Sequence, residues 1–377
     1  MERSSETESL ERARADAVPE ELRTALVGER AYLVGGTIRD ALLGRQLSDD
    51  VDLAVEGELD PILDRLGLPA HTHERFGTAS VQMDGLGIDI ARTRRERYPQ
   101  PGALPEVEPA PIRADLGRRD FTVNALAIPV AGDLELLDPY DGMADLRAGL
   151  LRSIASGSFR DDPTRALRAA RYAARLGFDL EGETESELRA SDLSTVSADR
   201  VEADLRRIAS EPSAVLGFDL LAAWGLLALD PERGDLLSEA AELSLLAPWG
   251  SLIDRGGLLV EIAIGPWDRI EAALRLARET RRERPASELF ELARSHDDHI
   301  LAIARAAGAE RLDQHVSEWR RVELTIGGSD LIAAGVPAGP ERGEALRAAL
   351  HARIDGEIPA GREAELEVAL AATGRSS

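Results

Sequence analysis

Two residue types are missing from the chain, and their absence limits the chemistry that it can perform. There is no cysteine, which excludes disulfides, thiolate metal sites and cysteine nucleophiles. There is also no lysine, since all 45 basic residues are arginine. This excludes Schiff-base catalysis through lysine and a P-loop with its usual lysine.

Aromatic residues and long apolar runs are scarce as well. Only 4% of the 377 residues are aromatic, while Ala, Leu, Arg and Glu dominate, which favours helix for most of the length. The longest apolar run, 220–229, is too short to span a bilayer, and the acidic N-terminus does not resemble a signal peptide. We therefore expect a cytoplasmic protein of two or three packed units, with no membrane partner and no stable protein partner.

Basic residues are in the minority overall, but not in every segment. The formal net charge is −24, which at first sight argues against a nucleic-acid partner. However, residues 92–120 contain seven arginines against five acids, and residues 160–175 contain five against two. Because RNA binding needs a local positive track and not a basic average, the net charge does not exclude RNA.

The stretch 31–55 combines a glycine turn with a helix start. A short strand leads to Gly35 and Gly36, and a helix is expected over 37–43. Glycines let backbone N–H groups approach an anion closely, and the helix N-terminus presents further unpaired donors. Arg39, one turn into the helix, could add a forked positive charge. The pattern predicts a cradle for an anion.

A second strand follows, with acids on one face. Asp50 and Asp52 alternate with Val51 and Leu53, so the carboxylates share one face and the apolar side chains share the other. Alone, such a strand would be an edge strand with solvated acids. Beside an anion cradle, two carboxylates suit divalent metals that carry a triphosphate.

At this spacing, Gly-Gly-x-x-Arg-Asp followed by Asp-x-Asp resembles the nucleotidyltransferase superfamily that includes DNA polymerase β. More narrowly, it resembles the class II tRNA nucleotidyltransferases (CCA-adding enzymes) and their bacterial poly(A) polymerase relatives. The resemblance implies that Gly35, Gly36 and Arg39 bind the nucleotide. It also implies that Asp50 and Asp52 are catalytic and hold two Mg²⁺ ions. Asp49 is an extra residue relative to the family pattern, and we assign it to the turn.

A third acid lies on an expected hairpin with arms 79–83 and 87–91. In the second arm Ile88 and Ile90 share one face and Asp89 takes the other. By itself, a lone strand acid is usually only solvated. The resemblance implies that Asp89 is the catalytic carboxylate that orients or deprotonates the primer 3′-hydroxyl.

Residues 92–113 are rich in proline and charge and have neither a helical nor a strand period. They predict a long loop, in which we find no convincing basic/acidic pair. By position the segment resembles the family's flexible loop, which helps to switch between CTP and ATP.

The next motif is Arg-Arg-Asp-x-x-x-Asn, at residues 118–124. A purely structural interpretation is a capped, salt-bridged helix start. The motif resembles a family signature, which implies that Arg119 contacts the nucleotide phosphates. It further implies that Asp120 and Asn124 lie near the ribose.

Residues 159–178 predict a helix that Gly177 ends, with Asp162, Arg165 and Arg168 three residues apart on one face and Arg171 nearby. An isolated segment of this kind would be an amphipathic helix with surface arginines. The motif resembles the family's (Glu/Asp)-Asp-x-x-Arg. This implies that Asp162 and Arg165 hydrogen-bond the base edge of C or A, while Arg168 and Arg171 hold phosphates.

The rest of the chain is less informative. Residues 196–205 resemble the family's next neck helix, and capping alone explains Asp199-Arg200. His296, Asp297 and His299 lack the further ligands of a phosphohydrolase metal site. The glycines of 324–343 resemble a tail segment that grips tRNA, although plain helix packing explains them equally well.

We therefore expect an α+β protein in four parts: an acidic extension (1–24), a polymerase β-like nucleotidyltransferase head with a small mixed sheet (25–150), a helical neck (151–210) and a helical body and tail (211–377). The resemblance implies template-independent addition of CCA to the 3′ end of tRNA from CTP and ATP. The alternatives are CC-only or A-only addition, a poly(A) polymerase, a small-molecule nucleotidyltransferase, and a non-catalytic RNA-binding descendant.

Overall fold

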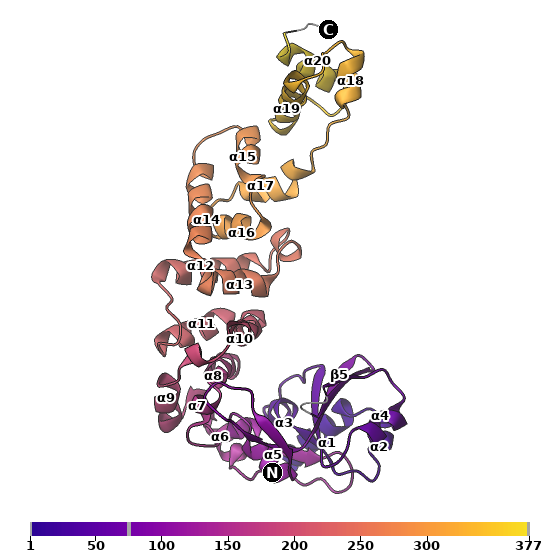
Figure 1. Cartoon of the computed structure of the whole chain (residues 1–377), viewed down its shortest axis with the longest axis vertical. Coiled ribbons are helices and arrows are strands. Elements are labelled where there is room, and N and C mark those ends of the chain that lie inside the picture. Colours follow the sequence, from indigo (N-terminus) through magenta and orange to yellow (C-terminus); the bar gives the residue numbers. More distant parts are fainter. Residues whose placement is uncertain (1, 74–76, 375–377) are drawn as a thin grey trace. The chain divides into compact units, whose positions relative to one another are not determined.

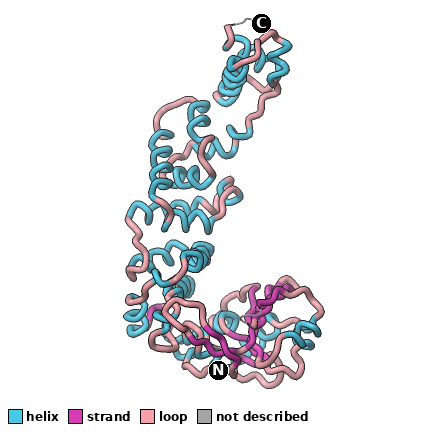
Figure 2. The backbone as a smooth tube through the Cα atoms, viewed as in Figure 1, coloured by secondary structure: helices cyan, strands magenta, loops and turns pink. Residues whose placement is uncertain are grey.

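The computed structural model of the chain describes residues 2–73 and 77–374. Packing divides the chain into two units, Met1–Ala228 and Leu229–Ser377. Every described strand lies in the first unit, and the described residues of the second form helices and loops (Figures 1 and 2). The α+β fold class is thus confirmed. The expected borders near residues 24, 150 and 210 all fall inside the first unit and stay predictions.

The first unit is built on a six-stranded mixed sheet with the order β3-β4-β5-β2-β1-β8. Strands β2 and β5 are parallel, and the other neighbouring pairs are antiparallel. The strands are β1 (Ala31–Val34), β2 (Asp50–Val55), β3 (His71–His73), β4 (Thr78–Met83), β5 (Leu86–Arg92) and β8 (Ala127–Pro129). The hairpin expected from residues 79–91 is confirmed as β4 and β5.

The alternation expected in β2 is confirmed. Val51 and Leu53 are buried in the main core together with Ile88 of β5, whereas Asp50 and Asp52 are exposed on the opposite face. Since a strand alternates its side chains, burying one set of residues requires the acids to face the other way. Asp49 precedes the strand and is exposed, as expected for a turn residue.

The acidic N-terminal segment is packed into the head. It forms α1 (Glu2–Ala17) and α2 (Glu20–Ala25), and α1 packs on α3 (Gly36–Leu42). Leu10, Val18 and Leu22 are buried in the main core. The few apolar residues of this segment therefore fix it to the head, although its composition is mostly polar. A fourth helix, α4 (Asp60–Leu66), packs against α2.

The prediction of a long loop without strands over 92–113 is wrong. Residues 94–109 form a two-stranded hairpin of β6 (Arg94–Arg97) and β7 (Glu106–Pro109), and α5 (Ile112–Gly117) follows. In the hairpin Arg95 stands opposite Glu108, and Arg97 stands opposite Glu106. Opposite charges across an antiparallel pair stabilise it, and a hydrophobicity pattern does not reveal such pairing.

Helices and a small two-stranded sheet continue the first unit. The predicted helix over 159–178 is present as two pieces, α7 and α8, and Gly177 ends it with φ +71°, as expected. The elements are α6 (Gly142–Ala148), β9 (Leu150–Leu151), α7 (Ser158–Asp161), α8 (Thr164–Leu176), β10 (Asp179–Leu180), α9 (Gly182–Arg189), α10 (Ala198–Ser210) and α11 (Ala214–Ala223).

The second unit contains the helices α12 (Pro231–Leu243), α13 (Arg255–Ile264), α14 (Trp267–Thr280), α15 (Ala286–Ala293), α16 (Asp298–Ala306), α17 (Leu312–Ser317), α18 (Gly328–Ala333), α19 (Pro340–Ile354) and α20 (Arg362–Ala372). Asp297 caps α16 and forms an ion pair with Arg269, and His299 contacts Glu261. Both side chains are therefore bound to other residues of the protein. In the parts of the chain that the structure describes, no helix is long and apolar enough to cross a membrane.

The interior of the second unit includes one histidine, His315 of α17. It is 2% exposed, and its ring lies 5.7 Å from that of Phe290 and 6.5 Å from that of Trp319. Its Nδ1 atom has no hydrogen-bond partner in the described structure. Burial, reinforced by the positive charge of Arg320, lowers the pKa of His315 from 6.5 to about 4.

We expect this histidine to make the protein less stable as the pH falls from about 6.5 to about 4. In that window the unfolded chain binds the proton and the folded chain does not, so stability is lost on acidification. Urea unfolding, followed by tryptophan fluorescence, would be compared between wild type and His315→Leu. The wild type should lose more stability than the variant over this window, and parallel pH profiles would contradict the assignment.

Candidate active site

A cleft of about 630 Å³ opens in the first unit, lined by the sheet, the β6–β7 hairpin and α8. It brings together seven of the residues predicted from the sequence, namely Asp52, Asp89, Arg119, Asp120, Asp162, Arg165 and Arg168. A second branch shares Asp52, Asp162 and Arg168 with the cleft and continues along α8 to Arg171. Residues more than a hundred positions apart in the sequence thus surround one space.

The acids are placed by the sheet. Asp52 of β2 stands directly beside Asp89 of β5 in the parallel register, and Asp50 lies on the same face of β2. Asp89 accepts a hydrogen bond from the Ser80 hydroxyl. Asp50 is outside the cleft lining, and its neighbour across the strands is Gly87, where a Cβ would lie 3.0 Å from Asp50 Oδ1.

The acids repel one another. Desolvation by the surrounding protein, opposed by Arg119 and reinforced by the negative charges of Asp89 and Asp50, raises the pKa of Asp52. Within the described residues, no three side chains of metal-binding type are grouped closely enough to hold an ion alone. That is compatible with Mg²⁺, which usually takes one or two carboxylates and completes its shell with water and substrate phosphates. Unbalanced carboxylate charge and hard oxygen donors therefore fit such an ion.

Gly35 lets the chain pass close to the cleft. Its φ is +75°, and α3 begins at the next residue, Gly36. A Cβ at Gly35 would lie 2.9 Å from Arg119 Nη1 and 3.7 Å from Asp52 Oδ2. The left-handed backbone conformation therefore favours glycine at this position, and a Cβ there would push against the Arg119 guanidinium.

Arg119 has only long contacts with the rest of the described protein. Its Nη1 lies 3.5 Å from the Asn124 carbonyl oxygen, its Nη2 lies 3.5 Å from Asp115 Oδ2, and its buried Nε has no hydrogen-bond partner in the described structure. Burial lowers the pKa of Arg119, although Asp115 opposes this effect. A half-buried guanidinium with only long contacts is suited to receive an anion.

The structure does not bring Arg39 to the cleft. This side chain is 2% exposed and makes an ion pair of 2.8 Å with Asp40. Its Nη1 donates to Asn124 Oδ1 at 2.6 Å. Asn124 is also buried and absent from the cleft lining, so both residues lie behind the surface that a ligand would touch.

These residues belong to a ring of polar groups, some buried and some half-buried, that α8 closes. Asn124 Nδ2 donates to Asp120 Oδ1 at 3.1 Å, and Asp120 Oδ2 pairs with Arg168 Nη2 at 2.6 Å. From the other end of α8, Arg175 donates to Asp40 Oδ2 at 3.0 Å. Burial alone would raise the pKa of Asp120, but Arg168 and the Asn124 amide hold it below its usual value. The ring therefore joins α3, residues 120–124 and α8.

Asp162 and Arg165 both line the cleft, and hydrogen bonds hold both side chains in place. Asp162 Oδ1 accepts from the Thr164 hydroxyl at 2.8 Å and from Arg200 at 2.9 Å. Arg165 donates to the carbonyl oxygens of Arg118 at 2.8 Å and Arg119 at 3.3 Å. Arg165 therefore also holds the turn that carries Arg119.

Arg171 lies in the second branch. Its Nη2 donates to the Tyr172 hydroxyl at 3.1 Å, and its guanidinium carbon lies 4.9 Å from the centre of that ring. Its buried Nε has no hydrogen-bond partner in the described structure.

The sequence interpretation missed a charged cluster on the β6–β7 hairpin. Glu96 pairs with Arg94 at 2.9 Å and with Arg118 at 3.0 Å, and all three residues line the cleft. The view that this segment contains no basic/acidic pair is therefore wrong. Tyr98 donates to Glu96 at 3.0 Å, and burial together with this carboxylate raises the pKa of Tyr98 to about 12. The alternation of residues 94, 96 and 98 was the available signal, because it places them on one strand face.

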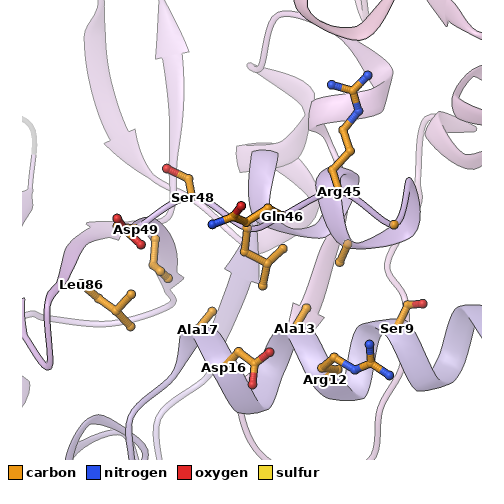
Figure 3. A pocket seen from close by; sticks show the side chains of 14 residues that line it. Ser9, Arg12, Ala13, Asp16, Ala17, Arg45, Gln46, Ser48, Asp49 and Leu86 are labelled. Atoms are coloured by element: carbon orange, nitrogen blue, oxygen red, sulfur yellow. The ribbon is translucent and has the colours of Figure 1, made fainter.

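A separate hollow of about 450 Å³ lies between α1 and the loop that leads into β2 (Figure 3). Val51 lines it, so it is on the opposite face of β2 from Asp52. Arg12 and Asp16 of α1 and Gln46 and Asp49 of the loop give it a lining of mixed charge. No residue that we expected to be catalytic or nucleotide-binding lines this hollow.

We expect the buried ring to be needed for folding. Replacing Asp40 with leucine would leave Arg39 buried without its ion-pair partner, which typically costs about 3–5 kcal/mol. Urea unfolding monitored by circular dichroism would measure the loss. The double variant Arg39→Met/Asp40→Leu removes both charges and should recover part of it, whereas an Asp40→Leu protein as stable as wild type would refute the role of the ring.

Comparison with known proteins gives three informative matches. Residues 31–152 match the family described as the poly A polymerase head domain. A CC-adding tRNA nucleotidyltransferase of Deinococcus radiodurans is 35% identical over 88% of this chain and 86% of its own length. An A-adding tRNA nucleotidyltransferase of Geobacter sulfurreducens is 30% identical over 90% of this chain, which spans only 44% of that relative.

A similar architecture is found in a solved structure. The apo form of a CCA-adding enzyme superposes with a TM-score of 0.81 at 26% identity, covering 96% of this chain and 98% of that one. The similarity extends over both units, and the two relatives and the solved structure are named for adding different nucleotides.

Proposed function

Because this chain belongs to the tRNA nucleotidyltransferase family, we propose that it adds CCA to the 3′ end of tRNA. The substrates are CTP and ATP, no nucleic-acid template is used, and pyrophosphate is released. One observation carries the proposal: the strand carboxylates, the arginines suited to phosphate, and Asp162 with Arg165 all line one cleft. We further propose that the helical second unit contributes to tRNA binding. The cytoplasmic location stays a prediction.

In this proposal the carboxylates serve the reacting oxygen atoms. Asp50 and Asp52 would hold Mg²⁺, which when bound supplies positive charge that offsets the negative charge of the phosphates. Asp89, held by Ser80, orients the 3′-hydroxyl of the tRNA and accepts its proton. The hydroxyl oxygen forms a bond to the α-phosphorus of the nucleotide, and the bond from that phosphorus to the leaving pyrophosphate breaks.

The cations of the cleft bind the triphosphate. Arg119 is the first candidate, since its long protein contacts leave it free to bind an anion strongly. Gly35 lies beside Arg119 and Gly36 begins α3, so both would present backbone N–H groups, and Arg168 and Arg171 continue the positive surface into the second branch. We assign Arg39 and Asn124 as positioning residues, since both are buried behind the cleft. Asp120 lies between the two groups and would act near the ribose.

Base selection is assigned to Asp162 and Arg165. A carboxylate can accept from the exocyclic amine of C or A, and a guanidinium can donate to the ring. U and G would leave these buried polar groups unpaired, which is the strongest basis for rejecting a substrate. Relatives named for CC addition and for A addition make partial specificity the second candidate.

The test is extension of a tRNA transcript that lacks its CCA end, with CTP, ATP or both, resolved on a sequencing gel. Two additions with CTP and a third only with ATP would support the proposal. A stop at CC, or addition only to a tRNA that already ends in CC, would favour partial specificity. A long ladder with ATP alone would indicate a poly(A) polymerase, and no extension would indicate a small-molecule substrate or a non-catalytic RNA-binding protein.

Replacing Asp52 with alanine should lower the rate of extension by about 10³-fold or more, because it removes several kcal/mol of charge stabilisation from the reaction. Circular dichroism and tRNA binding should remain as in wild type, since the acid is exposed on the sheet. Asp49→Asn is the matched control, because this acid is also exposed but precedes the strand. Retained activity in Asp52→Ala would refute the assignment.

Arg165 and Arg119 should give different kinetic phenotypes. Arg119→Ala should raise KM for all nucleotides alike, because phosphates are common to them. Arg165→Ala should in addition reduce the preference for CTP over UTP by about tenfold or more, because a base contact is lost. Steady-state kinetics with each nucleotide would measure both effects, and tRNA binding should change little. An unchanged CTP/UTP preference in Arg165→Ala would exclude base selection by this residue.

A further inference from the structure

Three residues of neighbouring strands stand in one line across the sheet. Asp52 of β2 is paired with Asp89 of β5, and Asp89 is paired in turn with Ser80 of β4. Directly paired residues of neighbouring strands project from the same face of a sheet. All three side chains line the cleft, so a hydroxyl group stands beside the two acids.

The packing of β4 in the core does not use this hydroxyl. The strand is fixed to the core by Ala79 and Val81, which are 1% and 2% exposed and project from the opposite face. Ser80 itself is exposed, and within the described residues its hydroxyl makes one hydrogen bond, to Asp89 Oδ1. A substitution at this position therefore changes the cleft and leaves the core intact.

The hydrogen bond between Ser80 and Asp89 leaves two acceptors next to each other. A serine hydroxyl has one proton and two lone pairs, and an ionised carboxylate can only accept, so the proton is donated to Oδ1. Ser80 Oγ can therefore take part in a further hydrogen bond only as an acceptor. Asp89 Oδ2 accepts no hydrogen bond from a described residue, so it also remains able to accept.

The end of an RNA chain presents the complementary pair of donors. Its last ribose carries a 2′-hydroxyl and a 3′-hydroxyl on adjacent carbons, and each of them can donate a proton. When the 3′-hydroxyl donates to Asp89 Oδ2, the neighbouring 2′-hydroxyl can donate to Ser80 Oγ. A deoxyribose end has no 2′-hydroxyl, which is the group by which a protein distinguishes RNA from DNA at a given site.

We propose that Ser80 recognises the 2′-hydroxyl of the tRNA end, so that Ser80 and Asp89 together bind the two adjacent hydroxyls of the terminal ribose. The inference rests on the proposed function, in which Asp89 receives the proton of the reacting 3′-hydroxyl. The 2′-hydroxyl keeps its proton and is only hydrogen-bonded. Two contacts fix the rotation of the sugar, which holds the 3′ oxygen in one direction for its attack on the α-phosphorus. Ser80 is thus a specificity-determining residue for an RNA end.

The test compares three versions of a tRNA that the enzyme extends. They differ only in the last sugar, which carries a 2′-hydroxyl, a 2′-hydrogen or a 2′-fluorine. Fluorine withdraws electrons but cannot donate a hydrogen bond, so it separates the contact with Ser80 from the acidity of the 3′-hydroxyl. In kcat/KM, wild type should prefer the hydroxyl end over each of the other two by about tenfold, because one hydrogen bond is lost with them.

Three variants assign this preference to one side chain. Ser80→Ala should lower kcat/KM with all three ends, because Asp89 loses its hydrogen bond, and should also bring the preference close to one. Ser80→Thr keeps the hydroxyl and should keep most of the preference. Thr78→Val is the matched control, since Thr78 also lines the cleft from β4 but is paired with Ala91. It should leave the preference unchanged.

Each other outcome contradicts a stated part of the inference. An equal loss with all three ends in Ser80→Ala would overturn the proposal, because Ser80 would then only hold Asp89. Equal extension of the three ends by wild type would overturn it as well, while the proposed function would stand. If wild type extends no tRNA end at all, the proposed function fails, and this inference fails with it.

Discussion

The arrangement of the candidate active site depends on a ring of buried and half-buried polar groups between α3, residues 120–124 and α8. The ring runs from Asp40 through Arg39 and Asn124 to Asp120 and Arg168, and Arg175 returns it to Asp40. A buried charge is costly unless it is fully paired, so each member restricts the position of the next. The ring therefore fixes α3, the segment 120–124 that follows Arg119, and α8 relative to one another. Buried ion pairs often add little net stability, so this fixed arrangement is the main consequence of the pairing.

A contrast in hydrogen bonding distinguishes this ring from the rest of the cleft lining, although Asp120 and Arg168 belong to both. Asp120 and Asn124, in the ring, have close partners. In the cleft, Arg119 has only long contacts, and desolvation together with the neighbouring acids raises the pKa of Asp52. A folded chain retains unbalanced groups where a ligand later balances them. Arg39 shows that a motif residue need not touch the ligand. Its guanidinium is already paired with Asp40 and Asn124 inside the protein.

Strand parity and capping chemistry made much of the head predictable. The alternation of Val51 with Asp50 and Asp52 identified the acid face, and Gly177 identified the end of α8. What the sequence did not reveal depends on contacts between distant segments. The β6–β7 hairpin is stabilised by opposite charges that face each other across its two strands. Its sequence therefore lacks the alternation of apolar residues from which a strand is predicted. The contacts of Arg200 could not be recognised either, because its two acceptors, Asp162 and the Gly102 carbonyl oxygen, are 38 and 98 residues away.

The absence of lysine becomes understandable from these contacts. Arg39 contacts Asp40 and Asn124, Arg165 contacts two carbonyl oxygens of one turn, and Arg200 contacts a carboxylate and a carbonyl. Each uses the planar fork of the guanidinium to fix two acceptors at once, which the single ammonium group of lysine does less well. The same property explains how a chain with a net charge of −24 can offer a site for a polyanion. The positive charge is concentrated by specific pairing in one cleft, so local geometry and not overall composition decides what the protein binds.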